Sequence, residues 1–229
     1  MFASTKSIHG NTCGQIFVNN LDFMRFVPMR KKKAAGHALE EFFQDVGVPR
    51  HLHVDNAPEL NSGHWKTVRE SQGGIRQTTT EPYSPWQNRA EACIRELKKR
   101  VKRTMSSVNA PLALWDYCAV WVAETHSKIA HDTWQLKGRS PEEHVTGETP
   151  DITEYVEFDW YTPVFYWEPT NKFPDGKRCI GRWLGVAHRV GQAMCYWVLP
   201  RSCQVLARST VQPMTADELA NPEIIAALQ

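Results

Sequence analysis

The sequence lacks any apolar stretch long enough to cross a lipid bilayer, which takes about 20 residues. Its longest candidate, Ala113–Ala123, is interrupted by Asp116. The segment Met1–Gly10 also lacks the basic residues followed by an apolar run that begin a signal peptide. We therefore expect an intracellular protein, nuclear or cytoplasmic, with no membrane partner.

Paired cysteines are missing as well. The six cysteines are scattered, and none forms a Cys-x-x-Cys pair, so the pattern is typical of reduced residues and predicts neither disulfides nor a zinc module. His51 and His53 alternate on one face of an expected strand, and we interpret them as ordinary strand residues. The chain contains no internal repeat or low-complexity tract, which excludes a repeat protein. Its 229 residues suffice for one or two domains with cores of their own.

The net charge of +2 hides an asymmetry between the two halves of the chain. Met1–Ser107 holds 17 Lys and Arg against 10 Asp and Glu, a formal charge of +7. Val108–Gln229 holds 10 against 15, a formal charge of −5. A basic half of this kind indicates a polyanionic partner such as nucleic acid.

Before residue 150, strand and helix patterns alternate along the chain. Gly14–Asn20 and Phe23–Met29 alternate around Asn19-Asn20-Leu21-Asp22, which predicts a β-hairpin. Short strands are expected at His51–Asp55 and Ile75–Thr80, and helices at Ala34–Val46, over about ten residues after Asn61 or Ser62, at Gln87–Val108, from near Pro111 toward Ile129, and at Ser140–Glu143. The order β-β-α-β-α-β-α-α indicates a mixed α/β domain.

After Gly147 the pattern changes to short β-like runs separated by turn residues. These runs are Phe158–Trp167, Cys179–Val186, Met194–Leu199 and Gln204–Val211. The segment 156–167 carries six aromatic residues, which we interpret as core rather than as a base-stacking surface. We therefore expect an α/β domain over 1–150, a small all-β, barrel-like domain over 151–213, and a tail over 214–229.

Two carboxylates stand out as candidates for chemistry. Asp55 ends an expected strand and faces a loop, where α/β domains place metal ligands and acid–base groups. Glu91 stands in the first turn of the long helix. Each also has a plain structural interpretation, because Asp before Asn is typical of a turn and Glu in a first turn favours the helix dipole.

The long helix joins Glu91 to a basic face. Glu91, Arg95, Lys98 and Lys102 fall at i, i+4, i+7 and i+11, beside an apolar stripe, and Arg103 adds a further cation. A carboxylate at the end of such a stripe suits a metal ion next to a phosphate backbone. The alternative is a solvated face with pairs such as Glu91–Arg95, each contributing tenths of a kcal/mol.

Asp55-Asn56, followed after thirty-five residues by Glu91 within Pro82-Tyr83-Ser84-Pro85-Trp86-Gln87-Asn88-Arg89-Ala90-Glu91, resembles the integrases of copia-type retrotransposons. Gly14–Met105 looks like the catalytic core of that family, and Arg178–Val211 like the β-rich region that follows the core in the polyprotein. The resemblance implies a ribonuclease-H-like fold with flanking helices and two-metal phosphoryl transfer that joins element DNA ends to target DNA.

The resemblance also implies a role for each matched residue. Asp55 and Glu91 are expected to be catalytic ligands of Mg²⁺, with Mn²⁺ as an alternative, and a homo-oligomer is expected. The residues expected at the DNA are Asn88, Arg95, Lys98, Lys102 and Arg103.

The sequence departs from the family in several places. The family's first Asp lies on the first strand, and Met1-Phe2-Ala3-Ser4 resembles the segment directly after it. Asp22 is the nearest substitute but lies in the hairpin turn, on the wrong strand. Ala57-Pro58 replaces two usual glycines, Arg89 replaces another, and the zinc-binding module before the core is not seen. We therefore expect an N-terminally truncated integrase in which two carboxylates hold one ion weakly.

Three hypotheses follow from these observations. The chain is a Mg²⁺-dependent integrase with impaired turnover, or a DNA-binding remnant of one that has lost turnover. In the third hypothesis it is an unrelated globular protein whose acidic pair is incidental.

Overall fold

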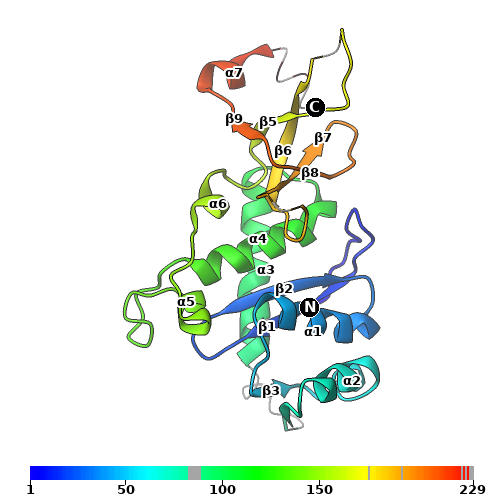
Figure 1. The fold of residues 1–229 in the computed structure, drawn as a ribbon, viewed down its shortest axis with the longest axis vertical. Coiled ribbons are helices and arrows are strands. Elements are labelled where there is room, and N and C mark those ends of the chain that lie inside the picture. The colour runs from blue at the N-terminus through cyan, green and yellow to red at the C-terminus, as the bar shows by residue number, and fades with distance from the viewer. Residues whose placement is uncertain (82–88, 175, 192, 223, 225, 227–229) are drawn as a thin grey trace. The chain divides into compact units, whose positions relative to one another are not determined.

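The computed structural model describes residues 1–81, 89–174, 176–191, 193–222, 224 and 226 (Figure 1). The chain divides into two compact units: Met1–Met105 with Pro111–Asp151, and Ser106–Ala110 with Ile152–Gln229. No helix among these residues is both long and apolar enough to span a membrane.

The first unit begins with the predicted hairpin. β1 (Cys13–Val18) pairs antiparallel with β2 (Met24–Met29), with Cys13 opposite Met29. The turn is held by the Asn19 side chain, whose Oδ1 accepts the backbone N–H of Leu21 at 2.8 Å and that of Phe23 at 3.0 Å. Asp22 takes a left-handed φ of 63° there, which Asp tolerates better than most residues.

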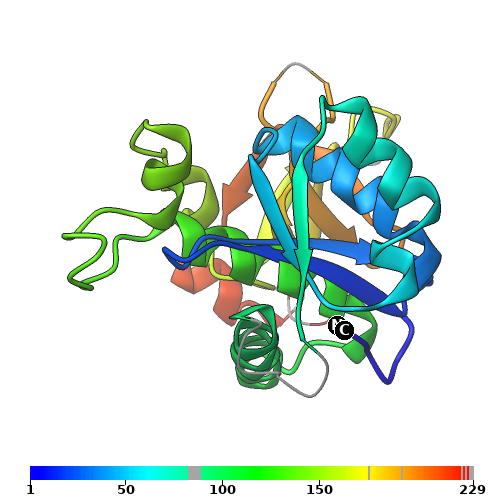
Figure 2. The same ribbon diagram turned by 90° about the horizontal axis from the view of Figure 1, so that it is seen from below.

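One face of the hairpin is covered by α1 (Ala35–Asp45) and α2 (Gly63–Ser71). Figure 2 shows these helices on one side of the strands and α3 (Arg89–Ser107), seen end-on, on the other. Alternate strand residues and the apolar helix stripes form the core on the α1 side, and its largest members are Phe17, Phe23, Met29, Leu39, Phe42 and Trp65. Trp65 and Val68 are buried, as predicted for α2.

The other face of the hairpin packs against α4 (Trp115–Lys128), which follows a 3₁₀ turn, η4 (Leu112–Leu114). The rings of Phe26 and Trp115 meet edge to face with centroids 6.2 Å apart. The Ser127 hydroxyl donates to the Met24 carbonyl at 2.7 Å and accepts the Met24 N–H at 2.8 Å. Strand β2 is therefore fixed to α4 by both apolar and polar contacts.

The apolar stripe predicted for α3 consists of Ile94, Leu97, Val101 and Met105. The last three are buried and Ile94 is half-buried, and the Cys118 thiol of α4 lies 4.0 Å from the Val101 carbonyl oxygen. Because this stripe faces inward, the basic side chains of α3 face solvent. The expected start at Gln87 lies outside the described residues.

A separate parallel pair completes the sheet region of the first unit. β3 (His51–Val54) pairs with β4 (Arg76–Thr79), and the 3₁₀ turns η1 (Lys32–Ala34) and η2 (Pro58–Leu60) precede α1 and α2. His51 and His53 both contact the Thr78 hydroxyl at 2.9 Å. Further along, the expected short helix is α5 (Pro141–Thr146), and it is capped by the Ser140 hydroxyl, which accepts the Glu143 N–H at 3.1 Å.

The second unit is built on an antiparallel sheet in the order β8-β7-β6-β5-β9. Its elements are α6 (Thr153–Val156), β5 (Pro163–Trp167), β6 (Arg178–Val186), β7 (Tyr196–Pro200), β8 (Leu206–Arg208), β9 (Val211–Pro213) and α7 (Ala216–Ala220). Trp160 and Trp183 are almost fully buried, and of the six clustered aromatics only Trp167 is exposed. The core interpretation of these aromatics is therefore confirmed.

Three details differ from the sequence-based expectations for the second unit. The run Phe158–Trp167 is a strand only over its second half, β5. The run Gln204–Val211 does not form one strand, because it is divided into β8 and the start of β9. Helix α6 was not predicted, since a single four-residue turn has no measurable periodicity.

Candidate active site

A pocket of about 180 Å³ lies in the first unit, between β1, the end of β3 and the start of α3. Its walls carry three carboxylates, Asp55, Glu59 and Glu91, together with one lysine, Lys32. The hairpin contributes Cys13–Ile16 and Met29, and the end of β3 adds His53 and Val54. Met1, Phe2 and apolar residues of the helices and of the turn after Asp55 complete the lining. Two of the predicted site residues, Asp55 and Glu91, therefore reach the same pocket although thirty-five residues separate them.

Asp55 is held in place by the turn that follows β3. Its Oδ1 accepts the Ala57 N–H at 3.0 Å, which is the turn geometry that the structural interpretation predicted. Asn56 donates from Nδ2 to the Thr80 carbonyl at 3.0 Å and so ties the end of β3 to the end of β4. The side chain of Asp55 is exposed, so it combines a fixed backbone with an accessible carboxylate.

Glu91 stands in the first described turn of α3, and Ala90 and Ile94 of the same helix also line the pocket. The unpaired N–H groups at a helix N-terminus favour a carboxylate at this position. Glu91 is exposed, and among the described residues it forms no ion pair with Arg95. The i,i+4 pair present on this helix instead joins Arg100 Nε to Glu96 Oε1 at 3.1 Å.

Glu59 and Lys32 were missed by the sequence-based reasoning. Glu59 lies in η2, four residues after Asp55, and its Oε1 lies 3.5 Å from Lys32 Nζ. Lys32 also lies over the Phe2 ring, 4.5 Å from its centroid. The spacing of Asp55 and Glu59 was the available signal, because a turn followed by a short helix returns the chain toward the same side.

The first residues of the chain form part of the pocket. The Met1 ammonium donates to the Gly14 carbonyl at 2.8 Å, and the Gly14 N–H donates to the Met1 carbonyl at 3.0 Å. Burial lowers the pKa of this ammonium group, while the Asp55 carboxylate opposes the shift. Asp22, considered above as a substitute for the family's first Asp, is ion-paired to Arg89 and does not line the pocket.

The oxygen donors of the pocket fit a hard divalent cation, because Mg²⁺ takes one or two carboxylates together with waters and phosphate oxygens. Asp55 and Glu91 are the donors that the sequence motif matches. Among the described residues, the pocket holds no group of three His, Cys, Asp or Glu ligand atoms within 4.8 Å of one another.

The predicted nucleic-acid contacts follow α3 away from the pocket. Arg95, Lys98, Lys102 and Arg103 are all exposed. Arg100, by contrast, forms an ion pair with Glu96 and a hydrogen bond with His126, whose Nδ1 lies 2.9 Å from Arg100 Nη1. Asn88, the remaining predicted contact, lies outside the described residues.

No family model and no curated protein matches the chain. Among solved structures, a chain of the simian T-cell lymphotropic virus intasome in complex with PP2A regulatory subunit B56 gamma is similar over 93% of this chain and 76% of that chain, with a TM-score of 0.51 and 17% identity. The fold is integrase-like. It is a ribonuclease-H-like mixed α/β unit with flanking helices, joined to a small β unit with a five-stranded sheet.

Two integrase catalytic core domains are also similar to part of the chain. The match to the HTLV-2 integrase catalytic core domain in complex with magnesium covers 58% of this chain and 83% of that chain, with a TM-score of 0.45 and 16% identity. The match to the BIV integrase catalytic core domain covers 58% of this chain and 84% of that chain, with a TM-score of 0.46 and 20% identity.

Proposed function

We propose that the chain acts in DNA integration as a Mg²⁺-dependent, nucleic-acid-binding unit of the copia type. The observation that carries the proposal is the common pocket of Asp55 and Glu91 at the start of a helix whose exposed face is basic. A bound Mg²⁺ would polarise a phosphate oxygen and stabilise the attacking and leaving oxygens of an in-line displacement.

The protein's own contribution is to position the DNA and the metal ligands. Asp55 and Glu91 would hold the ion, and the Asn56 bridge to β4 keeps the Asp55 turn in place. Lys98 and Lys102 would neutralise phosphates of the bound strand, since backbone contacts position DNA without reading its sequence. With two motif carboxylates in the pocket, we expect turnover to be slow.

The alternative is a DNA-binding remnant without turnover. Glu91→Gln separates the two, because it preserves the side-chain size and removes the negative charge. If the chain is an enzyme, joining of oligonucleotides in Mg²⁺ or Mn²⁺ falls at least about a hundredfold in this variant, as expected for loss of a charged group at the reacting centre. Equal joining with and without the Glu91 carboxylate would overturn the enzymatic proposal.

DNA binding is tested separately by Lys98→Ala with Lys102→Ala. Each lost phosphate contact is expected to reduce the slope of log K against log salt by about 0.9, so the pair should reduce it by about 2. A matched control removes the same charge elsewhere, by Lys31→Ala with Lys66→Ala, both exposed. If the α3 variant keeps the slope of the parent chain, or if the control variant loses as much slope as the α3 variant, the third hypothesis, an unrelated globular protein, is favoured.

Self-association is the companion proposal, since integrases of this type are expected to act as multimers. Sedimentation of the purified chain with and without duplex DNA measures it. A monomer under both conditions would overturn this part of the proposal.

A further inference from the structure

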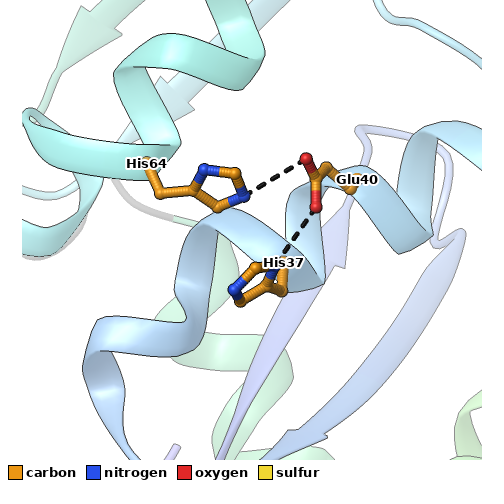
Figure 3. A group of neighbouring side chains, drawn as sticks. All are labelled: His37, Glu40 and His64. Carbon is orange, nitrogen blue, oxygen red and sulfur yellow. Dashed lines mark hydrogen bonds and ion pairs between the residues drawn. The ribbon is translucent and has the colours of Figure 1, made fainter.

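A second group of metal-binding side chains lies away from the pocket, where α1 and α2 cross. Figure 3 shows His37 and Glu40 of α1 and His64 of α2 pointing toward one another. His37 and Glu40 are three residues apart on one helix and so share a face. None of the three lines the pocket of Asp55 and Glu91.

The contacts within the group centre on the Glu40 carboxylate. Its Oε2 lies 3.2 Å from His37 Nδ1, and its Oε1 lies 3.2 Å from His64 Nε2. The two imidazole rings are 4.4 Å apart between centroids, and one ligand atom from each residue lies within 4.8 Å of the others. Hydrogen bonds from the two imidazoles lower the pKa of Glu40.

These distances suit a tetrahedral metal centre. Zinc takes imidazole nitrogen and carboxylate oxygen at about 2.0–2.2 Å, so the ligand atoms of a tetrahedral site stand about 3.3–3.5 Å apart. The two His–Glu spacings of 3.2 Å are close to that value, and they involve the two different oxygens of the Glu40 carboxylate. Rotation of the exposed His37 and His64 side chains would bring both nitrogens and one carboxylate oxygen onto one ion.

The helix backbones that carry the three residues are fixed. A Cβ added to Gly36 would lie 2.5 Å from His64 Cδ2 and 2.8 Å from the Trp65 backbone nitrogen, so α1 and α2 approach very closely beside the group. Trp65 and Leu39, next to His64 and Glu40 in sequence, are 2% and 0% exposed. Because these buried neighbours fix the backbone at His64 and Glu40, the donor atoms are held near their binding positions before a metal ion binds, which favours binding.

We propose that His37, Glu40 and His64 form a Zn²⁺ site with a fourth position open to water. Two imidazoles and one carboxylate select zinc and neighbouring transition metals over Mg²⁺, which prefers oxygen ligands alone. The ion joins α1 to α2 across the first unit. Its expected effect is therefore to stabilise the unit on which the Asp55 turn is built, whether or not the proposed function is correct.

The test uses the full chain after chelator treatment. Equilibrium dialysis against Zn²⁺ should give one bound ion per chain, with a rise in Tm that the same concentration of Mg²⁺ does not produce. His64→Gln and Glu40→Gln should each weaken binding at least about tenfold, because each removes one of three ligands. Circular dichroism of the metal-free variants shows whether the fold is kept.

The matched control is His51→Gln with His53→Gln, which removes another pair of exposed histidines and should leave binding unchanged. Substitution by Co²⁺ identifies the ligands, since thiolate ligation gives a charge-transfer band that nitrogen and oxygen ligands do not. No stoichiometric binding, binding that persists in His64→Gln, equal loss in the control, or a thiolate band would each overturn the proposal. None of these results depends on DNA joining, so the outcome is separate from that of the proposed function.

Discussion

Arg25 connects the hairpin to α4, and we expect Arg25→Met to destabilise the first unit strongly. The guanidinium of Arg25 forms an ion pair with Glu124 of α4 through Nη1 and a second with Asp45 through Nη2 at 3.3 Å. The Glu124 side chain is only 3% exposed and that of Arg25 16%. The substitution therefore removes the Arg25 cation from a buried carboxylate.

The magnitude follows from these burial values. Breaking a buried ion pair by removing one partner costs about 3–5 kcal/mol, whereas the more exposed pair with Asp45 adds about 0.2–1 kcal/mol. Replacing both partners by apolar residues, as in Arg25→Met with Glu124→Met, is expected to restore much of the loss, because no charge is left buried. The coupling between the two sites should accordingly exceed about 1 kcal/mol.

The assay must report on the first unit alone, because a chain with two units need not unfold in one step. Amide hydrogen exchange of Met24–Met29 and Trp115–Lys128, followed by mass spectrometry in a double-mutant cycle, does this. A loss below about 1 kcal/mol in Arg25→Met, or additive single and double variants, would refute the reasoning. Asp45→Asn serves as the control and should cost no more than about 1 kcal/mol.

Three further predictions concern stability. Burial and the Arg100 guanidinium lower the pKa of His126 from 6.5 to about 4. At pH values between these two pKa values, His126 is protonated in the unfolded chain but neutral in the folded chain. Stability should therefore fall as the pH drops from about 7 to about 5, by about 1 kcal/mol after solvent screening, and His126→Gln should remove this dependence in urea titrations. Gly36→Ala should cost about 1–3 kcal/mol by forcing α1 from α2, and a Tm equal to that of the parent chain would contradict the close approach. Ser140→Ala should cost about 1 kcal/mol by removing the cap of α5, whereas Ser140→Thr, which retains the hydroxyl at this buried position, should keep most of it, as thermal melts would show.

Much of the candidate site could be predicted from the sequence, because the position of each part depends on residues near it in the chain. Asp55 follows the short alternating run His51–Val54 and precedes Asn56, so its place at a strand end was predictable from neighbouring residues alone. The stripe of Leu97, Val101 and Met105 predicted which side of α3 is buried, and with it the exposed basic side. The buried aromatics of the second unit were expected for the same reason.

Other features depended on contacts that no local pattern contains. Lys32 reaches the pocket because it pairs with Glu59 of η2, and Arg89 meets Asp22 because α3 passes the hairpin turn. His37 and His64 looked like unrelated surface residues until the crossing at Gly36 brought their helices together.

The sequence by itself determined most of the helices and strands, the buried stripe of α3 and the positions of Asp55 and Glu91 along the chain. Only the tertiary structure decided that these two carboxylates share a pocket and that His37, Glu40 and His64 form a group. The physical reason is the distance along the chain over which each kind of interaction acts. Periodicity and turn chemistry act over a few residues, whereas the meeting of two helices or of a strand end and a helix start is set by packing of the whole unit.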